Sequence, residues 1–208
     1  MKRPAVAEAA GFLYFGGRNG RPRERRSRKG SGAMDYFEVI RKRRSIRAFQ
    51  PRPVEPEKLR RVLEAADLAP SAGNLQAYEI LVARDGERKR ALAQAALGQA
   101  FVAQAPVVLG FAANRSRSAA KYGRRGAELY ALQDATIACA YAQLAATAEG
   151  LATVWVGAFD DDAVAEALDL PEGLRPAALL PLGYAAEEPE PTPRRSLEEI
   201  ARELPPRR

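Results

Sequence analysis

The sequence predicts an α+β fold, and two observations support this prediction. Segments with the apolar and β-branched character of strands occur at residues 78–83, 106–113, 151–158 and 177–184. Segments with apolar residues at helical spacing lie among them, but helices and strands do not alternate in a strict βαβ order. An α+β arrangement therefore fits this order better than a doubly wound parallel sheet.

The length and cysteine content limit the class of protein. A chain of 208 residues corresponds to one domain, or to one domain with an appendage. The single cysteine excludes an intrachain disulfide and fits a reducing, cytoplasmic setting. The sequence contains no run of about 18 apolar residues, so no membrane span is predicted. The apolar patch at residues 9–15 is short and has no clear cleavage site after it, so we do not expect a signal peptide.

The net charge of +7 is concentrated in the first 33 residues. This segment contains nine of the 33 basic residues and two of the 26 acidic residues, so 24 of each sign remain in the rest of the chain. Its Gly, Pro, Ser and Arg content predicts disorder. We therefore expect a basic extension at 1–33 and a neutral functional domain at 34–208. A neutral body makes nucleic acid an unlikely partner.

The first part of the domain predicts three helices and one strand. Asp35 is a suitable N-cap for a helix at 36–43, with Phe37 and Ile40, and Val39 beside them, on the buried side. Further helices are expected at 57–69 and 87–97, on either side of the strand at 78–83.

The second part of the domain predicts the longest helix, at 126–149, ended by Gly150. Residues 114–125 before it are polar and basic, typical of a loop or an exposed helix start. Apolar residues occupy nearly every face of the long helix, which implies burial all round. A single domain of this size meets that need most easily when two subunits pack against the helix, so we predict a homodimer. A helix capped by Asp160 and a short helix capped by Ser196 follow.

The polar segment Pro70–Gln76 lies between a predicted helix and a predicted strand. Its two amide side chains, Asn74 and Gln76, offer donors and acceptors suited to a flat heteroaromatic ring. On these residues alone, a simple helix-to-strand connector is the alternative interpretation.

The segment Arg43–Arg47 is a candidate phosphate site. In an extended chain Arg43, Ser45 and Arg47 point to one side, and two guanidinium groups with a hydroxyl suit a phosphate dianion. A solvated basic turn or a nucleic-acid patch remains the alternative interpretation of these residues alone.

The side chains offer little catalytic machinery of their own. The sequence has no histidine, which excludes Ser-His-Asp and Cys-His systems and His-ligated metals. Cys139 lies in the most apolar helix and is expected to pack in the core. The run Asp160–Asp162 fits a helix cap better than a metal site. Since glycine-rich Rossmann and P-loop motifs are also missing, an enzyme of this sequence would depend on a cofactor for the difficult step.

Five features in a fixed order resemble the nitroreductase family of FMN-dependent oxidoreductases. They are Arg-Arg-Ser-Ile-Arg-x-Phe at 43–49, Ala-Pro-Ser-Ala-Gly-Asn-Leu-Gln at 69–76, Gly-Leu-Ala-Thr-Val-Trp-Val-Gly-Ala-Phe at 150–159, Leu-Pro-Leu-Gly-Tyr-Ala-Ala-Glu-Glu-Pro at 180–189, and the pair Arg194-Arg195. The resemblance covers about residues 35–202. It implies a mixed sheet flanked by helices, with the long helix at a homodimer interface that holds two FMN molecules.

The resemblance also implies which residues contact FMN. The phosphate and the pyrimidine edge would be held by the first segment and the late basic pair. The flavin ring would contact the 70–76 loop, from the partner subunit in this family, and the strand end at 156–158, where a backbone amide would lie near N5. The implied cofactor-binding residues are Arg43, Arg44, Ser45, Arg47, Pro70, Ser71, Asn74, Gln76, Val156, Gly157, Ala158, Arg194 and Arg195.

The chain departs from the pattern of many members in three places. Val156 replaces a frequent acidic residue, Ala77-Tyr78 replaces a frequent Pro-Trp, and residues 114–125 offer little sequence for a substrate lid. These differences leave the acceptor and the use of NADH or NADPH open.

The resemblance implies a function in which NAD(P)H reduces FMN, and reduced FMN then passes two electrons to a small organic acceptor such as a nitroaromatic or a quinone. No residue is expected to be catalytic apart from the flavin, and no metal is expected. Two alternatives remain open from the sequence: a flavin-binding protein without NAD(P)H turnover, and a nucleic-acid-associated protein acting through the basic tail.

Overall fold

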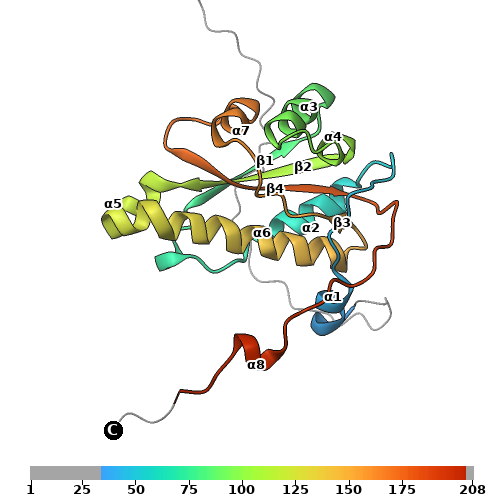
Figure 1. Cartoon of the computed structure of the whole chain (residues 1–208). Coiled ribbons are helices and arrows are strands. Elements are labelled where there is room, and N and C mark those ends of the chain that lie inside the picture. Colours follow the sequence, from blue (N-terminus) through green and yellow to red (C-terminus); the bar gives the residue numbers. More distant parts are fainter. Residues whose placement is uncertain (1–33, 205–208) are drawn as a thin grey trace, which may run out of the picture. The chain divides into compact units, whose positions relative to one another are not determined.

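The computed structural model describes residues 34–204, and the prediction for the 1–33 extension lies outside them. The described chain contains a four-stranded sheet with strand order β1-β2-β4-β3 (Figure 1). The α+β prediction is confirmed. The strands are β1 Tyr78–Ala83, β2 Val107–Asn114, β3 Ala152–Thr153 and β4 Leu174–Gly183.

All three pairs of neighbouring strands are antiparallel. A bulge between Phe111 and Ala112 shifts the register of β2 against β4. Among the described residues, parallel pairing is confined to an isolated bridge between Ser45 and Thr153. This bridge places the arginine-rich segment beside β3, at one edge of the sheet.

Helices cover both faces of the sheet (Figure 1). Helices α2 and α6 pack on one face, and α3, α4 and α7 pack on the other. The helices are α1 Tyr36–Lys42, α2 Pro56–Asp67, α3 Gly86–Ala95, α4 Phe101–Gln104, α5 Arg115–Arg125, α6 Ala131–Ala148, α7 Asp161–Ala167 and α8 Leu197–Ile200. A 3-10 turn, Ala72–Asn74, precedes β1, and a π-helical turn, Gly126–Tyr130, joins α5 to α6. None of the helices within residues 34–204 is both long and apolar enough to cross a membrane.

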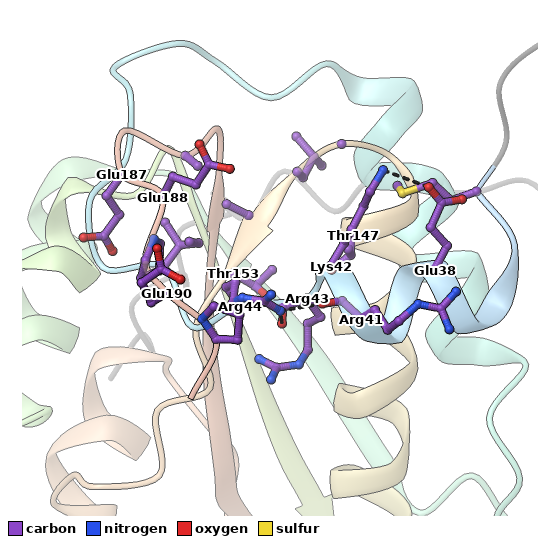
Figure 2. A pocket seen from close by; sticks show the side chains of 18 residues that line it. Glu38, Arg41, Lys42, Arg43, Arg44, Thr147, Thr153, Glu187, Glu188 and Glu190 are labelled. Atoms are coloured by element: carbon purple, nitrogen blue, oxygen red, sulfur yellow. Dashed lines mark hydrogen bonds and ion pairs between the residues drawn. The ribbon is translucent and has the colours of Figure 1, made fainter. Parts of the chain in front are cut away.

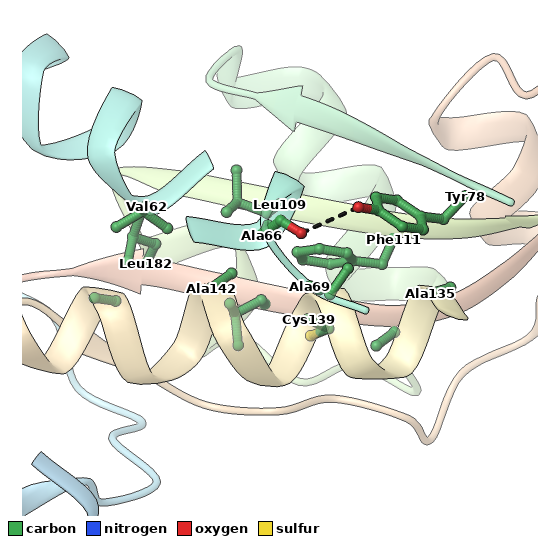
Figure 3. Packing of buried hydrophobic residues seen from close by; sticks show 14 of the residues in the cluster. Val62, Ala66, Ala69, Tyr78, Leu109, Phe111, Ala135, Cys139, Ala142 and Leu182 are labelled. Carbon is green, nitrogen blue, oxygen red and sulfur yellow. Dashed lines mark hydrogen bonds between the residues drawn. The ribbon is translucent and has the colours of Figure 1, made fainter. Parts of the chain in front are cut away.

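Alternating side chains of the central strands build the two cores, because successive residues of a strand point to opposite faces. Leu109 and Phe111 of β2 pack toward α2 and α6 (Figure 3), whereas Val108, which precedes Leu109, packs toward α3 and α4. The Tyr78 hydroxyl donates a hydrogen bond to the carbonyl oxygen of Ala66 at 3.0 Å, which ties β1 to α2. Each fully buried Leu or Phe contributes about 1.5–3 kcal/mol from burial.

Helix α6 lies against the sheet through small side chains. Five alanines and Cys139 form its fully buried face, which allows the helix to approach α2 and the strands closely (Figure 3). Burial raises the pKa of Cys139, as expected for a packing residue. Ile137 and Tyr141 remain 36 % and 42 % exposed, so within one chain a stripe of α6 is uncovered.

Several helix ends match the caps that the sequence predicts. The side chains of Asp35 and Asp160 accept hydrogen bonds from backbone N–H groups at the starts of α1 and α7. Gly150 adopts a φ of 71° just after α6. Ser196 and Glu199 form a capping box at α8. These caps act within four residues, which is why the local sequence is sufficient to predict them.

Two sequence-based expectations need correction, for the strand at 151–158 and the buried side of α1, and one open alternative, for residues 114–125, is resolved. The strand expected at 151–158 is limited to β3 and one bridge between Val156 and Leu179, because the chain leaves the sheet edge before α7. Residues 115–125 form α5, which Asn114 caps by accepting a hydrogen bond from the N–H of Arg117. On α1, Val39 is buried while Phe37 and Ile40 are exposed, because one face of α1 has no packing partner within the described chain.

Candidate functional site

The arginine-rich segment after α1 is fixed along the edge of the sheet. The N–H of Ile46 donates to the carbonyl oxygen of Thr153 at 3.0 Å, and the Ile46 side chain is buried. On the far side, the Glu187 carboxylate accepts hydrogen bonds from the N–H groups of Arg47 and Ala48. The backbone of the segment is therefore held from both sides, while the Arg47 side chain is exposed.

A cavity of about 1070 Å³ lies between the end of α1, residues 150–153 and residues 185–191. Figure 2 shows Arg43, Arg44 and Thr153 near its centre, with Glu187, Glu188 and Glu190 on another side. The Arg44 guanidinium donates to the carbonyl oxygens of Arg41 and Arg43, which are free at the C-terminal end of α1. Arg44 thus supports the helix end, while the guanidinium group of Arg43 forms no hydrogen bond within residues 34–204.

Basic groups gather around Arg43 on one wall of this cavity, while Glu38 and the three glutamates after β4 also line it. Burial lowers the pKa of Arg43, and the charges of Arg194 and Arg44 lower it further. The chain segment after β4 therefore brings Arg194 near Arg43, whereas Arg195 does not contribute to this shift. A bound anion would offset the repulsion among the three guanidinium groups.

Thr153 adds a polar group to the same wall. Its side chain is 2 % exposed, and its hydroxyl oxygen has no hydrogen-bond partner within residues 34–204. A buried hydroxyl without a partner is costly, and a ligand oxygen in the cavity could satisfy it. The sequence analysis did not single out Thr153, although it belongs to the motif at 150–159.

The 70–76 loop is held by its own side chains. The Ser71 hydroxyl oxygen accepts a hydrogen bond from the N–H of Gln76 at 2.9 Å, which closes the loop. The Gln76 amide nitrogen donates to the backbone and side-chain oxygens of Asp67 at 3.2 and 3.1 Å. Asn74 is exposed, and its side-chain amide forms no hydrogen bond within the described residues.

Helix α5 lies against this loop. The Arg117 guanidinium donates to the carbonyl oxygen of Gln76 at 2.7 Å. A Cβ atom on Gly73 would lie 2.4 Å from the Tyr122 hydroxyl and 2.6 Å from the Lys121 ammonium. Both atoms end flexible side chains that can move aside, so glycine is favoured at position 73 chiefly by its φ of 59°.

Asp134 is a site residue that the sequence analysis missed. It lies on the buried face of α6 and is 2 % exposed. Its carboxylate accepts hydrogen bonds from the N–H groups of Ala72 at 2.9 Å and Ala77 at 3.4 Å. Burial raises the pKa of Tyr78, and the nearby charges of Asp67 and Asp134 raise it further. One sequence signal was available: Asp134 is the only charged residue of α6.

The strand end at 156–158 presents an open backbone. Val156 exchanges two hydrogen bonds with Leu179, each 2.9 Å long, and is buried. Gly157 and Ala158 are exposed, and the carbonyl oxygen of Ala158 accepts a hydrogen bond from Gln99. The N–H of Gly157 has no acceptor within residues 34–204, so it is available to a ligand.

Two groups of the expected site residues lie apart in a single chain. Arg43 and Arg44 line the cavity together with Thr147, at the C-terminal end of α6. Ser45 pairs with Thr153 at the same sheet edge, and the charge of Arg194 reaches Arg43. Pro70, Ser71, Asn74 and Gln76 lie near Asp134, at the start of α6. Thirteen residues of helix correspond to about 20 Å along the axis. One chain therefore does not bring the loop and the arginines into one cavity.

Metal ligands are not gathered in the described part of the chain. Residues 34–204 contain no cluster of three or more Cys, Asp or Glu side chains arranged to hold a metal. Asp160 instead caps α7 by accepting from the N–H of Ala163, and Asp161 pairs with Arg175 at 2.9 Å. The site can thus bind an anion and present backbone donors, but it offers no paired nucleophile and base.

Comparison with known proteins gives a consistent result. The model of the nitroreductase family matches residues 40–104 and 95–184. An NADH dehydrogenase of Thermus thermophilus is 38 % identical over 194 residues, which cover 80 % of this chain and 95 % of the relative. An FMN reductase [NAD(P)H] of Bacillus subtilis is 35 % identical and shares 73 % of this chain and 66 % of its own.

Solved structures agree with these relatives. The structure of an NADPH:FMN oxidoreductase from Vibrio harveyi in complex with NAD+ has a TM-score of 0.74 at 30 % identity, and the match covers 80 % of this chain and 76 % of that chain. A nitroreductase family protein from Streptococcus pneumoniae has a TM-score of 0.74 at 26 % identity, and the match covers 82 % of this chain and 100 % of that chain.

Proposed function

The chain belongs to the nitroreductase family, and from this premise we propose that it uses FMN to transfer two electrons from NAD(P)H to a small organic acceptor such as a nitroaromatic or a quinone. The single observation that carries this proposal is a cavity lined by Arg43, Arg44 and Thr153, in which the charge of Arg194 reaches Arg43 and the Thr153 hydroxyl has no partner within residues 34–204. The names of the similar proteins, an NADH dehydrogenase and an FMN reductase, support the donor and the cofactor.

The residues present fit the phosphate end of FMN. Arg43 and Arg194 would bind the phosphate through charge-assisted hydrogen bonds, and the Ser45 and Thr153 hydroxyls would donate beside them. The geometry favours Arg194 over Arg195, because the charge of Arg194 reaches Arg43. The repulsion among the guanidinium groups would be relieved when the dianion binds.

The flavin ring of FMN fits beside the strand end at 156–158 and Arg47. Thr153 and Gly157 are four residues apart in a nearly extended chain, which corresponds to about 13 Å. FMN is an elongated molecule, so a phosphate near Thr153 and a ring near the free N–H of Gly157 are compatible. The positive charge of Arg47 would stabilise negative charge on the pyrimidine edge of the reduced ring.

When bound, FMN would supply the redox chemistry by accepting a hydride from a nicotinamide and giving two electrons to the acceptor. The protein would contribute position and electrostatics. Arg43 and Arg194 would hold the phosphate. The N–H of Gly157 would orient the flavin ring, and the Asn74 amide would contact the polar edge of the ring.

We also propose a homodimer, and the separation of the two groups of site residues supports it. In one chain the loop and the arginines lie at opposite ends of α6. Two copies with antiparallel α6 helices would bring the loop of one copy to the arginines of the other. The exposed apolar side chains of α1 and α6, including Phe37, Ile137 and Tyr141, would be covered in the same way.

Anaerobic reduction tests the function. Purified protein, or protein reconstituted with FMN, should be yellow, and its absorption near 450 nm should bleach when NADH or NADPH is added. The colour should return when a quinone or nitroaromatic is added. Protein that remains yellow with both nucleotides would be a flavin binder without turnover.

Colourless protein that takes up no FMN would overturn the proposal. Gel-shift measurements with the full chain and with residues 34–208 would then test the basic tail as a nucleic-acid contact. The reducing, cytoplasmic setting suggested by the single cysteine belongs to the same proposal.

A further inference from the structure

A buried carboxylate is an unusual feature on the apolar face at the start of helix α6. Asp134 is 2 % exposed and is surrounded on α6 by the fully buried Ala131, Ala135 and Ala138. An ionised carboxylate is strongly disfavoured in such a place unless hydrogen bonds compensate for lost water. The carboxylate of Asp134 therefore needs hydrogen-bond donors close to it.

Both partners of this carboxylate belong to the 70–77 segment. One oxygen accepts from the N–H of Ala72 at 2.9 Å, and the other accepts from the N–H of Ala77 at 3.4 Å. These two donors bracket the turn that carries Asn74. We propose that Asp134 is a positioning residue that sets the 70–76 loop for contact with the flavin ring, an inference that rests on the proposed function.

The backbone of the loop explains why it needs such support. Gly73, Asn74 and Gln76 have φ values of 59°, 56° and 46°, in the left-handed region that side-chain-bearing residues avoid. Strain of this kind persists only where surrounding contacts over-determine the conformation, and it occurs mainly at functional sites. The Asp134 carboxylate provides such contacts from α6, through its hydrogen bonds with the loop backbone.

Other polar groups of the loop also hold its conformation through hydrogen bonds. The Ser71 hydroxyl closes the loop internally, and the Gln76 amide is bound to Asp67. Arg117 fixes the carbonyl oxygen of Gln76 from the side of α5. Asn74 alone among the loop amides keeps a side chain free of hydrogen bonds within the described residues, and Asp134 holds the turn that presents it.

The substitution Asp134→Asn tests this role because it preserves size. An amide has a single oxygen, so one of the two backbone N–H groups would face an NH₂ group instead of an acceptor. The matched control is Cys139→Ser, which places a polar atom on the same buried face of α6, at a position that forms no hydrogen bond with the loop. Both substitutions should lower the melting temperature, so stability alone does not distinguish them.

Three measurements separate positioning from general destabilisation. In Asp134→Asn, hydrogen exchange at the amides of Ala72 and Ala77 should accelerate about tenfold, on the scale of one lost buried hydrogen bond. FMN affinity should fall about tenfold on the same scale, and the visible spectrum of bound FMN should shift toward that of free FMN. Cys139→Ser should leave the exchange at both amides, the affinity and the spectrum unchanged.

Unchanged exchange at Ala72 and Ala77 in Asp134→Asn would overturn the inference, as would faster exchange with unaltered FMN affinity and spectrum. If the wild-type protein binds no FMN, the proposed function fails and the inference fails with it. If the wild type binds FMN and Asp134→Asn binds it equally well, the inference alone fails.

A second variant serves if Asp134→Asn does not fold. Ala72→Pro removes one donor from the loop side, and Ser71 before it already has the extended backbone that precedes proline, with φ −139° and ψ 156°. Faster exchange at Ala77 and weaker FMN binding in this variant would support the role, and wild-type values of both would overturn it.

Discussion

Arg194 lies close enough to Arg43 for its charge to lower the pKa of Arg43, although the two residues come from opposite ends of the described chain. Arg44 lowers the pKa of Arg43 further, and burial is the largest cause. A protein that gathers like charges in this way gains when a phosphate binds among them.

Arg43→Ala should weaken FMN binding by about 1.5–3 kcal/mol, the range for a hydrogen bond to a charged group. Arg194→Ala should have a similar effect, and Arg195→Ala a smaller one. Titration of the apoprotein followed by FMN fluorescence measures all three. Arg60→Ala is the control, because Arg60 pairs with Glu64 on the surface of α2. Equal affinity in Arg43→Ala and Arg60→Ala would contradict the phosphate assignment.

Tyr141→Asp should convert the proposed dimer into monomers, because it places a charge on the exposed stripe of α6. FMN affinity should fall at the same time, since the loop and the arginines would no longer meet. Sedimentation velocity gives the mass. Leu97→Asp is the control, because Leu97 is exposed after α3, on the other face of the sheet from α6. A dimer that survives Tyr141→Asp would place the interface elsewhere.

Gly126→Ala should destabilise the protein, although helix propensity alone predicts a gain of up to about 1 kcal/mol. A Cβ atom at this position would lie 2.4 Å from the backbone carbonyl oxygen of Ser118, which cannot move without shifting α5. We expect a net loss of about 1–3 kcal/mol in the free energy of unfolding, measured in urea.

Gly110→Ala is the comparison for that measurement. Its Cβ atom would meet the methyl group of Leu168 at 2.5 Å, a side-chain end that can rotate. The loss in Gly110→Ala should therefore be smaller than in Gly126→Ala. The reverse order would show that the contact between α5 and the π-helical turn is softer than its geometry indicates.

Glu55 should make the stability of the protein depend on pH in the acidic range. A hydrogen bond from the Tyr184 hydroxyl, with contributions from its own backbone N–H and from Arg52, lowers the pKa of Glu55 from 4.5 to about 2. Because the folded-state pKa is the lower one, this contribution is fully present above about pH 4.5 and is lost as the pH falls toward 2. The difference in melting temperature between wild type and Glu55→Gln should thus shrink from pH 6 to pH 2. A constant difference would contradict the assignment.

The local sequence was sufficient for most elements and for their ends. The strand at 78–83 has the predicted bounds, and the caps at Asp35, Asp160 and Ser196 act as predicted. Motif order was sufficient for the family. Helix α4 and the extent of α5 were missed because short or polar helices depend on packing more than on apolar periodicity.

Asp134 and Thr153 were missed for a different reason. Each became notable through a partner, or the lack of one, that is defined by the fold. The partners of Asp134 lie 57 and 62 positions away in the sequence. The unpaired Thr153 hydroxyl is visible only after the strands and the segment after β4 are assembled.

The sequence by itself determined most of the helices and strands and the family, because these follow from local periodicity and motif order. The tertiary structure decided that Arg194 is the late arginine near Arg43, that Asp134 supports the 70–76 loop, and that α6 separates this loop from the arginines. Such relationships join residues distant in the chain, and they depend on how the helices pack against the sheet.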